Sequence, residues 1–327
     1  MNFGIKLVCL LLAMLVAACG ESRQPTIDSL TADRTGSSVP KTETVRVTFI
    51  LKSLTNPFFV AMAKGAREAQ METGIDLQVL APTPQTSIEQ QIRAIEGAIK
   101  ARSKAIVVTP VDTRRLQPVL KKAQDAGIHI INVDERLEPS AFAENALRLI
   151  PFIGVDNEHA AYLAAKVIAD QIGAPTEAMI VEGVPGTNTA LARGRGIRAA
   201  FTENRYIRVV ASAPGYWSAE EAYVVTKNMF RSHPNIGVVY CSNDMMAIGV
   251  IKYLQENGRK KVLVGGFDAI EESKTAVRAG QMTVTVDQLA AGQGYAAVMS
   301  ALRLIHGEPV PDVVVLQAQT VTAATVK

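Results

Sequence analysis

Polar and aromatic residues that suit ligand contacts stand directly after short apolar runs, which are predicted to be strands. Carboxylates and amides form paired hydrogen bonds with neighbouring hydroxyls, arginine donates through a planar fork, and aromatic rings cover C–H faces and exclude water. A sugar ring needs both kinds of contact, because it carries several hydroxyls and has two partly apolar faces. The pattern therefore indicates sugar binding. The candidate residues are Asn56, Phe58, Phe59, Asp134, Glu135, Arg136, Arg193, Trp217, Asn243, Asp268 and Gln288.

Several of these positions have an alternative, structural interpretation. Phe59 lies on the apolar face of a predicted helix and could be a core residue alone. Asn56 and Asn243 precede predicted helices, where Asn is a favoured N-cap, although a cap can also contact a ligand. Gln288 lies near an expected crossing between domains and could belong to a hinge. Asp244 is interpreted as a helix cap rather than as a ligand contact.

An enzyme is the alternative from another functional class. Asp134, Glu135 and Asp268 could supply the carboxylate pair used in glycoside hydrolysis. A Rossmann enzyme is disfavoured, because residues 51–55, after the first predicted strand, contain no glycine for a phosphate-binding turn. Cys241 lies in an apolar run and is interpreted as a small buried hydrophobe, not a nucleophile. We therefore favour a binding protein without catalysis.

The composition limits the possible partners. The 327 residues include 34 Lys and Arg against 31 Asp and Glu, so the formal net charge is only +3. No basic block is present, and nucleic-acid binding is therefore not expected. The four His and three Cys are too scattered for a zinc framework, so we predict neither a metal nor another cofactor. A length of 327 residues is enough for two domains, and a hydrophobic content of 48% is enough for a large core.

From residue 45 onward, predicted strands and helices alternate. Alternation of this kind indicates parallel sheets with helices on both faces, here in two similar doubly wound α/β domains. Ligands of such sheets bind beyond the carboxyl ends of the strands, where the candidate residues stand. The predicted strands are 45–51, 76–80, 105–109, 128–133, 152–155, 179–182, 208–212, 237–241, 262–265 and 283–286. The predicted helices are 113–126, 158–172, 189–202, 219–231, 245–256 and 290–306, with two more that begin after residues 56 and 87.

The N-terminal segment is predicted to be a targeting signal. Residues 1–18 contain an apolar run of twelve residues, 7–18, which is too short for a membrane span of ~20 residues. Val16-Ala17-Ala18-Cys19 resembles the lipobox of bacterial lipoproteins, in which the Cys is lipidated and becomes the mature N-terminus. An ordinary secretory signal with an incidental Cys is the alternative. Residues 19–44 would comprise the lipidated Cys19 and a flexible tether rich in Ser, Thr, Pro and charge.

From residue 45 to the C-terminus, the chain resembles the periplasmic sugar-binding proteins of ABC importers, most closely the ribose-binding type. The shared motifs occur in the family's order: NPFF, VD-R, GT-NxxxxxRGxG, a Trp before a helix, SND, GFD and DQ. The resemblance implies that a sugar ring lies between aromatic side chains and that polar side chains bind its hydroxyls. The aromatic residues would be Phe58, Phe59 and Trp217, and the polar residues Asn56, Asp134, Arg193, Asn243, Asp268 and Gln288.

Two positions depart from the ribose-binding pattern. The family's Asp-Arg pair is here Asp134-Glu135-Arg136, so either Glu135 or Arg136 fills the second position. Trp217 stands where ribose-binding proteins carry Phe and galactose-binding relatives carry Trp. These departures leave the identity of the monosaccharide open.

The resemblance also implies an architecture and a partner. The fold would be that of type I periplasmic binding proteins, with two lobes that are joined by a three-strand hinge and close on the ligand. The protein would be a monomer, lipid-anchored to the membrane in the periplasm or at the cell surface, and would deliver a monosaccharide to an ABC transporter permease. A receptor for a chemotaxis or sensor-kinase partner shares this fold and is the alternative. The expected lobes are 45–154 plus 289–317 and 155–288 plus 318–327, with hinge residues Gly154, Val155, Asp156, Leu289, Gln317 and Ala318.

Overall fold

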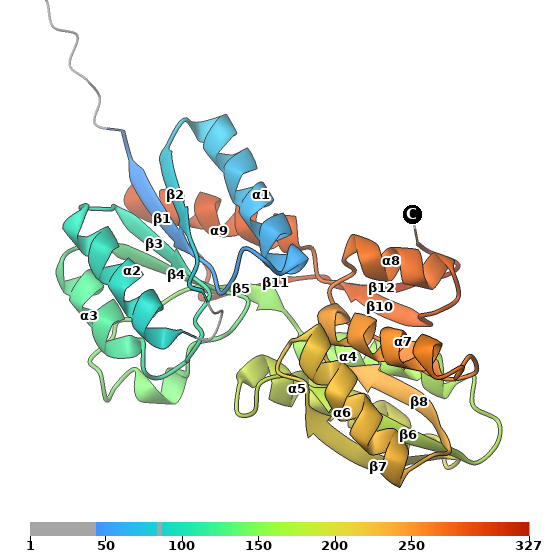
Figure 1. Cartoon of the computed structure of the whole chain (residues 1–327). Coiled ribbons are helices and arrows are strands. Elements are labelled where there is room, and N and C mark those ends of the chain that lie inside the picture. Colours follow the sequence, from blue (N-terminus) through green and yellow to red (C-terminus); the bar gives the residue numbers. More distant parts are fainter. Residues whose placement is uncertain (1–43, 84–86, 327) are drawn as a thin grey trace, which may run out of the picture. The chain divides into compact units, whose positions relative to one another are not determined.

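The computed structural model describes residues 44–83 and 87–326 (Figure 1). The predicted signal peptide, Cys19 and the tether up to residue 43 lie outside the described residues. Within the described ranges, no helix is long and apolar enough to cross a membrane. These residues form two six-stranded sheets, which we call the sheets of the first and second lobes.

The sheet of the first lobe is built from the N-terminal part of the chain and one late strand. Its strands are β1 (Arg46–Ile50), β2 (Asp76–Leu80), β3 (Ala105–Val108), β4 (His129–Val133), β5 (Phe152–Val155) and β11 (Val313–Leu316). Its helices are α1 (Pro57–Thr73), α2 (Ile88–Lys100), α3 (Gln117–Asp125) and α9 (Ala290–Ile305), with a 3-10 turn at Pro139–Ala141. The strand order is β11-β5-β4-β3-β1-β2, and every pairing is parallel. Helices α1 and α9 cover one face, and α2 and α3 cover the other.

The sheet of the second lobe repeats this arrangement. Its strands are β6 (Thr176–Glu182), β7 (Ile207–Pro214), β8 (Ile236–Cys241), β9 (Leu263–Gly265), β10 (Val284–Asp287) and β12 (Gln319–Thr322). Its helices are α4 (Asn157–Ala169), α5 (Asn188–Thr202), α6 (Ala219–Ser232), α7 (Asp244–Glu256) and α8 (Glu271–Arg278). The order β12-β10-β9-β8-β6-β7 is equivalent to that of the first lobe, so the prediction of two similar doubly wound domains is confirmed. One pairing differs from the prediction of parallel sheets, because the edge strand β12 runs antiparallel to β10.

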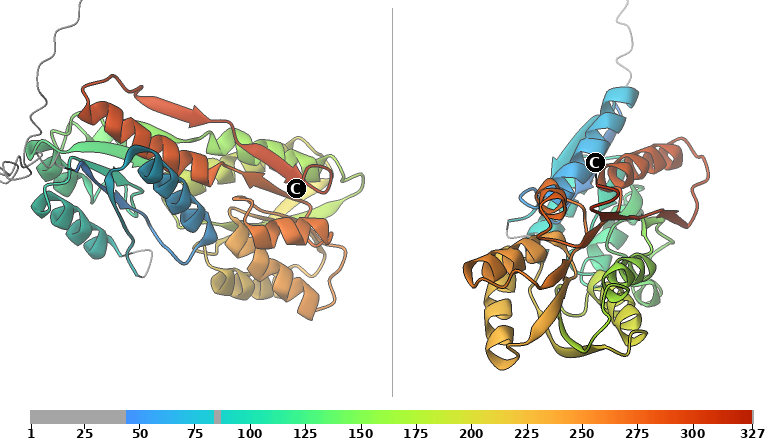
Figure 2. Two further views of the ribbon diagram at one scale, coloured as in Figure 1. Left: turned by 90° about the horizontal axis from the view of Figure 1, so that it is seen from above. Right: turned by 90° about the vertical axis from the view of Figure 1, so that its right-hand side faces the viewer.

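The chain passes between the two sheets at three places. Strand β5 leads into α4, β10 leads into α9, and β11 continues into β12 through Gln317 and Ala318. Helix α9 returns to the first lobe, where it packs beside α1 (Figure 2). Leu289, which precedes α9, has a φ of +56°, and this left-handed conformation turns the chain between β10 and α9.

Glycines let neighbouring helices pack with their backbones in contact. A Cβ atom at Gly65 of α1 would lie 1.8 Å from the Ala291 carbonyl oxygen of α9. In the second lobe, a Cβ atom at Gly196 of α5 would lie 2.1 Å from the Glu158 carbonyl oxygen of α4. A larger residue at either position would force the helices apart, since interiors are close-packed. The close packing therefore fixes α1, which carries Phe58 and Phe59, and α5, which carries Arg193.

Candidate functional site

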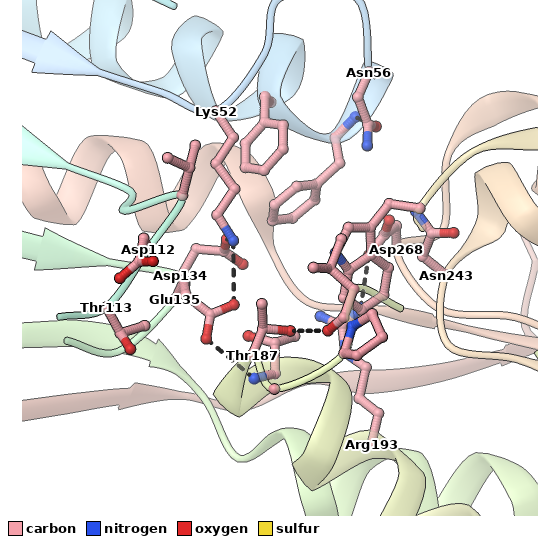
Figure 3. Close-up of a pocket in the computed structure, with 18 of the residues that line it drawn as sticks. Lys52, Asn56, Asp112, Thr113, Asp134, Glu135, Thr187, Arg193, Asn243 and Asp268 are labelled. Atoms are coloured by element: carbon pink, nitrogen blue, oxygen red, sulfur yellow. Dashed lines mark hydrogen bonds and ion pairs between the residues drawn. The ribbon is translucent and has the colours of Figure 1, made fainter. Parts of the chain in front are cut away.

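A cavity of about 430 Å³ lies among the loops that follow strands of both sheets (Figure 3). This volume is within the range of ligand pockets, ~300–1,000 Å³, and the position at the carboxyl ends of parallel strands is typical of α/β ligand sites. Of the candidate residues, all except Arg136 line the cavity. Further lining residues are Lys52, Ile88, Val111, Asp112, Thr113, Arg114, Val184, Pro185, Gly186, Thr187 and Thr189.

Arg193 of α5 is buried, with its guanidinium held by several groups. Its Nε donates to Asn157 Oδ1 at 2.8 Å, and its Nη1 donates to the Ser242 carbonyl oxygen at 2.9 Å. Nη1 also lies 3.6 Å from Asp268 Oδ1, and the guanidinium lies 3.7 Å from the centroid of the Phe267 ring. Burial lowers the pKa of Arg193, whereas the nearby Asp268 carboxylate raises it. The orientation of the guanidinium is therefore set by the protein itself.

Asp268 lies in the loop between β9 and α8 and is supported by two glutamines. Gln288 Nε2 donates to Asp268 Oδ1 at 2.6 Å, and Gln293 Nε2 donates to the Gln288 carbonyl oxygen at 2.8 Å. Burial raises the pKa of Asp268 well above its usual range; Arg193 lowers it, and the charge of Asp244 raises it further. A ligand hydroxyl that donates to this carboxylate would favour its charged form.

Trp217 forms an aromatic surface on the second lobe. It follows Tyr216 in the turn before α6, and both residues have a positive φ, +63° for Trp217 and +52° for Tyr216. The indole lies against the backbone of Gly183, where a Cβ atom would be 2.0 Å from Trp217 Cζ2. The absence of a side chain at Gly183 therefore provides the space that the indole occupies.

Phe58 and Phe59 form the aromatic surface of the first lobe. Their ring centroids are 5.0 Å apart, and the ring planes make an angle of 67°. Both residues also pack in the core of the first lobe, so the core and cavity-lining interpretations of Phe59 hold together. Asn56 caps α1, because its Oδ1 accepts the N–H of Phe58 at 3.0 Å. The cap uses the oxygen of the Asn56 side chain and leaves its amide nitrogen for other contacts.

Lys52 is a cavity residue that the sequence analysis did not identify. Its Nζ donates to Glu135 Oε2 at 3.1 Å and lies 3.9 Å from Asp134 Oδ2 (Figure 3). Glu135 Oε1 accepts the N–H of Thr189 at 3.2 Å, so its carboxylate joins the first lobe to the start of α5. Burial raises the pKa of Asp134, an effect that Lys52 opposes. The signal that could have found Lys52 is its position in the loop after β1, which also carries Asn56.

Arg136 does not reach the cavity. Its guanidinium lies over the Phe152 ring, 5.5 Å from the centroid, and its carbonyl oxygen accepts a hydrogen bond from Asn188 Nδ2 at 2.9 Å. Asp134 has a φ of +65°, and the chain after this bend carries Glu135 buried at the cavity and Arg136 exposed. The sequence left open whether Glu135 or Arg136 fills the second position of the motif, and the structure places Glu135 at the cavity.

Two observations concern metal ligands and the thiol of Cys241. No group of three or more His, Cys, Asp or Glu that could hold a metal ion occurs within 44–83 and 87–326. Cys241 is buried, and burial raises the pKa of its thiol well above the usual value. A thiol in such surroundings stays neutral and is a poor nucleophile.

Known proteins are similar in both sequence and structure. The D-ribose/D-allose-binding protein of Pseudomonas aeruginosa is 32% identical over 269 residues, which cover 81% of this chain and 84% of that protein. The D-allose-binding periplasmic protein of Escherichia coli is 33% identical over 241 residues, 73% of this chain and 78% of that protein. An ABC transporter periplasmic solute-binding protein of Actinobacillus succinogenes, solved with bound D-allose, is 35% identical with a TM-score of 0.83; the match covers 86% of this chain and 98% of that one.

The family assignment follows from these similarities together with the fold. Residues 47–309 match the family model described as periplasmic binding protein domain. Two equivalent α/β sheets with a cavity among their loops agree with this match. The chain belongs to the periplasmic binding protein family, whose members are extracytoplasmic, non-enzymatic solute-binding components of transport systems.

Proposed function

We propose that this protein captures a monosaccharide in the cavity and delivers it to the permease of an ABC transporter. The observation that carries the proposal is the cavity lining, in which a buried guanidinium, carboxylates and amides lie between two aromatic surfaces. Hydroxyl groups can pair with the polar side chains, while the aromatic rings cover the apolar faces of the sugar. The polar residues proposed to bind hydroxyls are Asn56, Asp134, Arg193, Asn243, Asp268 and Gln288. The rings proposed to enclose the sugar are those of Phe58, Phe59 and Trp217.

Lys52 extends this set on the side of the first lobe. An ammonium group has three N–H donors, and Glu135 accepts one of those of Lys52. The remaining donors, beside the cavity, can reach a ligand hydroxyl close to Asp134. Glu135 itself is engaged by Lys52 and by the N–H of Thr189, so we assign it to holding Lys52 and the start of α5. D-allose is the first ligand to test, because three similar proteins carry it in their names or structures.

We propose that the two lobes close over the ligand by rotation at the three crossings. Two hydrogen bonds already join the lobes beside the cavity, from Thr189 to Glu135 and from Asn188 to Arg136. A sugar that contacts both lobes binds the closed form better than the open form and therefore favours closure. The proposed hinge residues are Gly154, Val155, Asp156, Leu289, Gln317 and Ala318. Small-angle scattering should show a smaller radius of gyration when the sugar is bound.

We further propose that Cys19 is the lipid-bearing residue and that the chain up to residue 44 is its tether. The basis is the sequence Val16-Ala17-Ala18-Cys19 after a short apolar run. Cys19→Ala should release the protein from the membrane or block its processing, and membrane fractionation with mass spectrometry measures both. Unchanged membrane association and mass in this variant would contradict the assignment.

A ligand screen tests the proposed function directly. Thermal unfolding of the wild-type protein is measured with D-allose, D-ribose, myo-inositol and xylitol, and hits are titrated by calorimetry. A ligand at 100 times its dissociation constant adds ~2.7 kcal/mol of stability, which is easily detected. Arg193→Ala serves as the control, because its weaker binding should reduce the response at the same ligand concentration. No saturable response to any monosaccharide or polyol would overturn the proposal.

A further inference from the structure

Asp244, the first residue of α7, is fully buried beside the site without lining the cavity. Its Oδ1 accepts the hydroxyl of Thr285 at 2.7 Å, and its Oδ2 accepts the N–H of Ile270 at 3.0 Å. Its own N–H donates to the Phe267 carbonyl oxygen at 2.8 Å. Asp244 therefore joins α7 to β10 and to both ends of the segment 267–270, which carries Asp268.

The segment 267–270 has a backbone conformation that needs such support. Asp268 has a φ of +124° and Ala269 a φ of +50°, and both values are unfavourable for residues with a side chain. Strained residues of this kind persist only where the surroundings determine their conformation. The N–H of Ala269 donates to Thr285 Oγ1 at 3.2 Å, and that hydroxyl donates in turn to Asp244. The carboxylate thus ends a chain of hydrogen bonds that holds the strained pair.

Asp244 also replaces a missing helix cap. The N-cap position of α8 is occupied by Ile270, whose side chain cannot accept a hydrogen bond, and no side-chain cap is formed there. The Asp244 carboxylate accepts the Ile270 N–H instead. Gly266 leaves room for this carboxylate, because a Cβ atom at that position would lie 2.2 Å from Asp244 Oδ1. The residues next to α8 thus provide no side-chain cap for its first N–H groups, and Asp244, 26 positions before Ile270, provides the acceptor instead.

We propose that Asp244 is a positioning residue for sugar binding, which holds the segment 267–270 so that the Asp268 carboxylate faces the cavity. The inference rests on the proposed function, because it assigns Asp268 to ligand hydroxyls. It goes beyond the proposed function because Asp244 does not line the cavity and acts only through Asp268. The interpretation of Asp244 as the cap of its own helix is thereby replaced, since Asn243 caps α7 by accepting the Met246 N–H at 3.0 Å.

The charges around Asp244 link it to Asp268 electrostatically. Burial raises the pKa of Asp244 to about 6, although the hydrogen bonds from Thr285 and Ile270 lower it. The titratable groups facing it are Asp268, Tyr240 and Cys241, and burial raises the pKa of each of these. The negative charge of Asp244 therefore raises the pKa of Asp268, and its removal lowers that pKa.

Binding of D-allose and D-ribose by matched variants tests the proposal. The Asp244 carboxylate accepts from both the Thr285 hydroxyl and the Ile270 N–H, whereas the amide of Asp244→Asn has one acceptor oxygen and turns its NH2 group toward the other donor. Because one buried donor then loses its acceptor, the variant should bind the sugar about tenfold more weakly at pH 8. Thr285→Val should weaken binding similarly, whereas Thr285→Ser, which keeps the hydroxyl, should bind like wild type. Glu271→Gln removes an exposed charge from the first turn of α8 and is the control, with unchanged affinity.

The pH dependence separates positioning from a loss of stability. In Asp244→Asn, the pH at which affinity declines should move to lower values, because Asp268 loses a neighbouring negative charge. A merely destabilised protein would keep the wild-type midpoint. Binding by folded Asp244→Asn within twofold of wild type at pH 8, with an unchanged midpoint, would overturn the proposal.

Hydrogen exchange tests the positioning step without a ligand, so its failure is distinguishable from failure of the proposed function. In sugar-free wild type, the amides of Ala269 and Ile270 should be protected, and in Asp244→Asn they should exchange faster while β8 stays protected. Equal protection of these two amides in both proteins would overturn the proposal, even if wild type binds D-allose. If wild type binds no sugar, faster exchange in Asp244→Asn still supports the role of Asp244 in holding the loop.

Discussion

The two sides of the cavity differ in how fully their polar groups are bonded within the protein. On the second lobe, Arg193 is held by Asn157, Ser242 and Asp268, and Gln288 holds Asp268 in turn. On the first lobe, the Asp134 carboxylate has one ion pair, to Lys52 at 3.9 Å, among the described residues. The second lobe therefore presents an ordered set of groups, whereas the Asp134 carboxylate of the first lobe keeps most of its acceptor capacity for the ligand.

This difference suggests an order of events in binding. A sugar that meets the second lobe finds donors and acceptors already oriented, so little further ordering is needed there. In the proposed closure, the first lobe then adds Asp134, Lys52 and Asn56, together with Phe58 and Phe59. The second lobe should thus dominate affinity, and the first lobe should contribute mainly to retention. Substitutions on each side test this division.

The largest effect is expected for Arg193→Ala. Removal of this buried guanidinium leaves Asp268 without its cation, and unpaired buried groups of this kind cost about 2–5 kcal/mol of binding. The dissociation constant for the sugar that wild type binds should therefore rise about 30-fold or more. Arg195→Ala is the matched control, because Arg195 lies on the same helix but is exposed and paired with Glu158. If both variants bind equally well, the ordered set on the second lobe does not determine affinity.

A smaller loss is expected for Trp217→Ala. The substitution removes the ring surface of the second lobe, and aromatic contacts contribute about 0.5–1.5 kcal/mol beyond their burial, so binding should weaken about tenfold. Trp217 is the only Trp of the chain, so its fluorescence in wild type should change saturably with the sugar. Tyr216→Ala, at the exposed neighbouring position, is the control. Wild-type affinity in Trp217→Ala would show that the indole only packs against Gly183.

A pH titration probes both sides of the cavity at once. Burial raises the pKa of Asp134 on the first lobe and of Asp268 on the second. Sugar hydroxyls that donate to these carboxylates favour the charged forms, so binding releases protons and affinity falls as pH falls through the ligand-free pKa values. For one carboxylate the loss approaches tenfold per pH unit, that is about 1.4 kcal/mol, below its pKa.

The stability of the ligand-free protein should show the opposite dependence. A raised carboxyl pKa means that the folded state binds the proton more tightly than the unfolded state does. This contribution to stability is therefore present at low pH and is lost as pH rises through the folded-state pKa. Calorimetry at pH 5 and pH 8 measures the affinity, and denaturant unfolding at the same pH values measures the stability. Affinity that is equal at both pH values would contradict the assignment of these carboxylates to ligand hydroxyls.

Much of the site could be predicted because parallel strands end at a common edge. Asn56 and Asp134 follow strands of the first sheet, and Asn243 follows a strand of the second; the sequence marks all three strands as apolar runs. The carboxyl ends of both sheets border the same cavity, so the fold brings these residues together. Lys52 was missed because a loop lysine usually extends into solvent. Here its contacts with the buried carboxylates of Glu135 and Asp134 hold it at the cavity. These contacts join segments distant in sequence, and a local pattern does not encode them.

The choice between Glu135 and Arg136 depended on the backbone conformation of the loop, which the sequence does not specify. Adjacent loop residues point in different directions, and after the bend at Asp134, with its positive φ, Glu135 is the one that faces the cavity. Asn157 was also missed, because its position as the first helical residue after the N-cap Asp156 does not indicate a contact with another helix. Its role appears only once α5 places Arg193 within 2.8 Å of it.

The smallest effect is expected for Arg136→Ala, which probes the outer edge of the first lobe. The Arg136 side chain is exposed and lies over Phe152, and its link to Asn188 uses the backbone oxygen, which alanine retains. The dissociation constant for the bound sugar should change less than twofold, and an exposed cation–π contact contributes only about 0.5–1 kcal/mol to stability.

Glu135→Gln is the variant to compare with Arg136→Ala, because it removes the charge that pairs with Lys52 and faces the N–H of Thr189. It should weaken binding several-fold, chiefly by faster dissociation, since its contacts hold the closed form together. Stopped-flow fluorescence of Trp217 measures the dissociation rate in both variants. A larger loss in Arg136→Ala than in Glu135→Gln would reverse the assignment, with the exposed arginine rather than the buried glutamate acting in ligand retention.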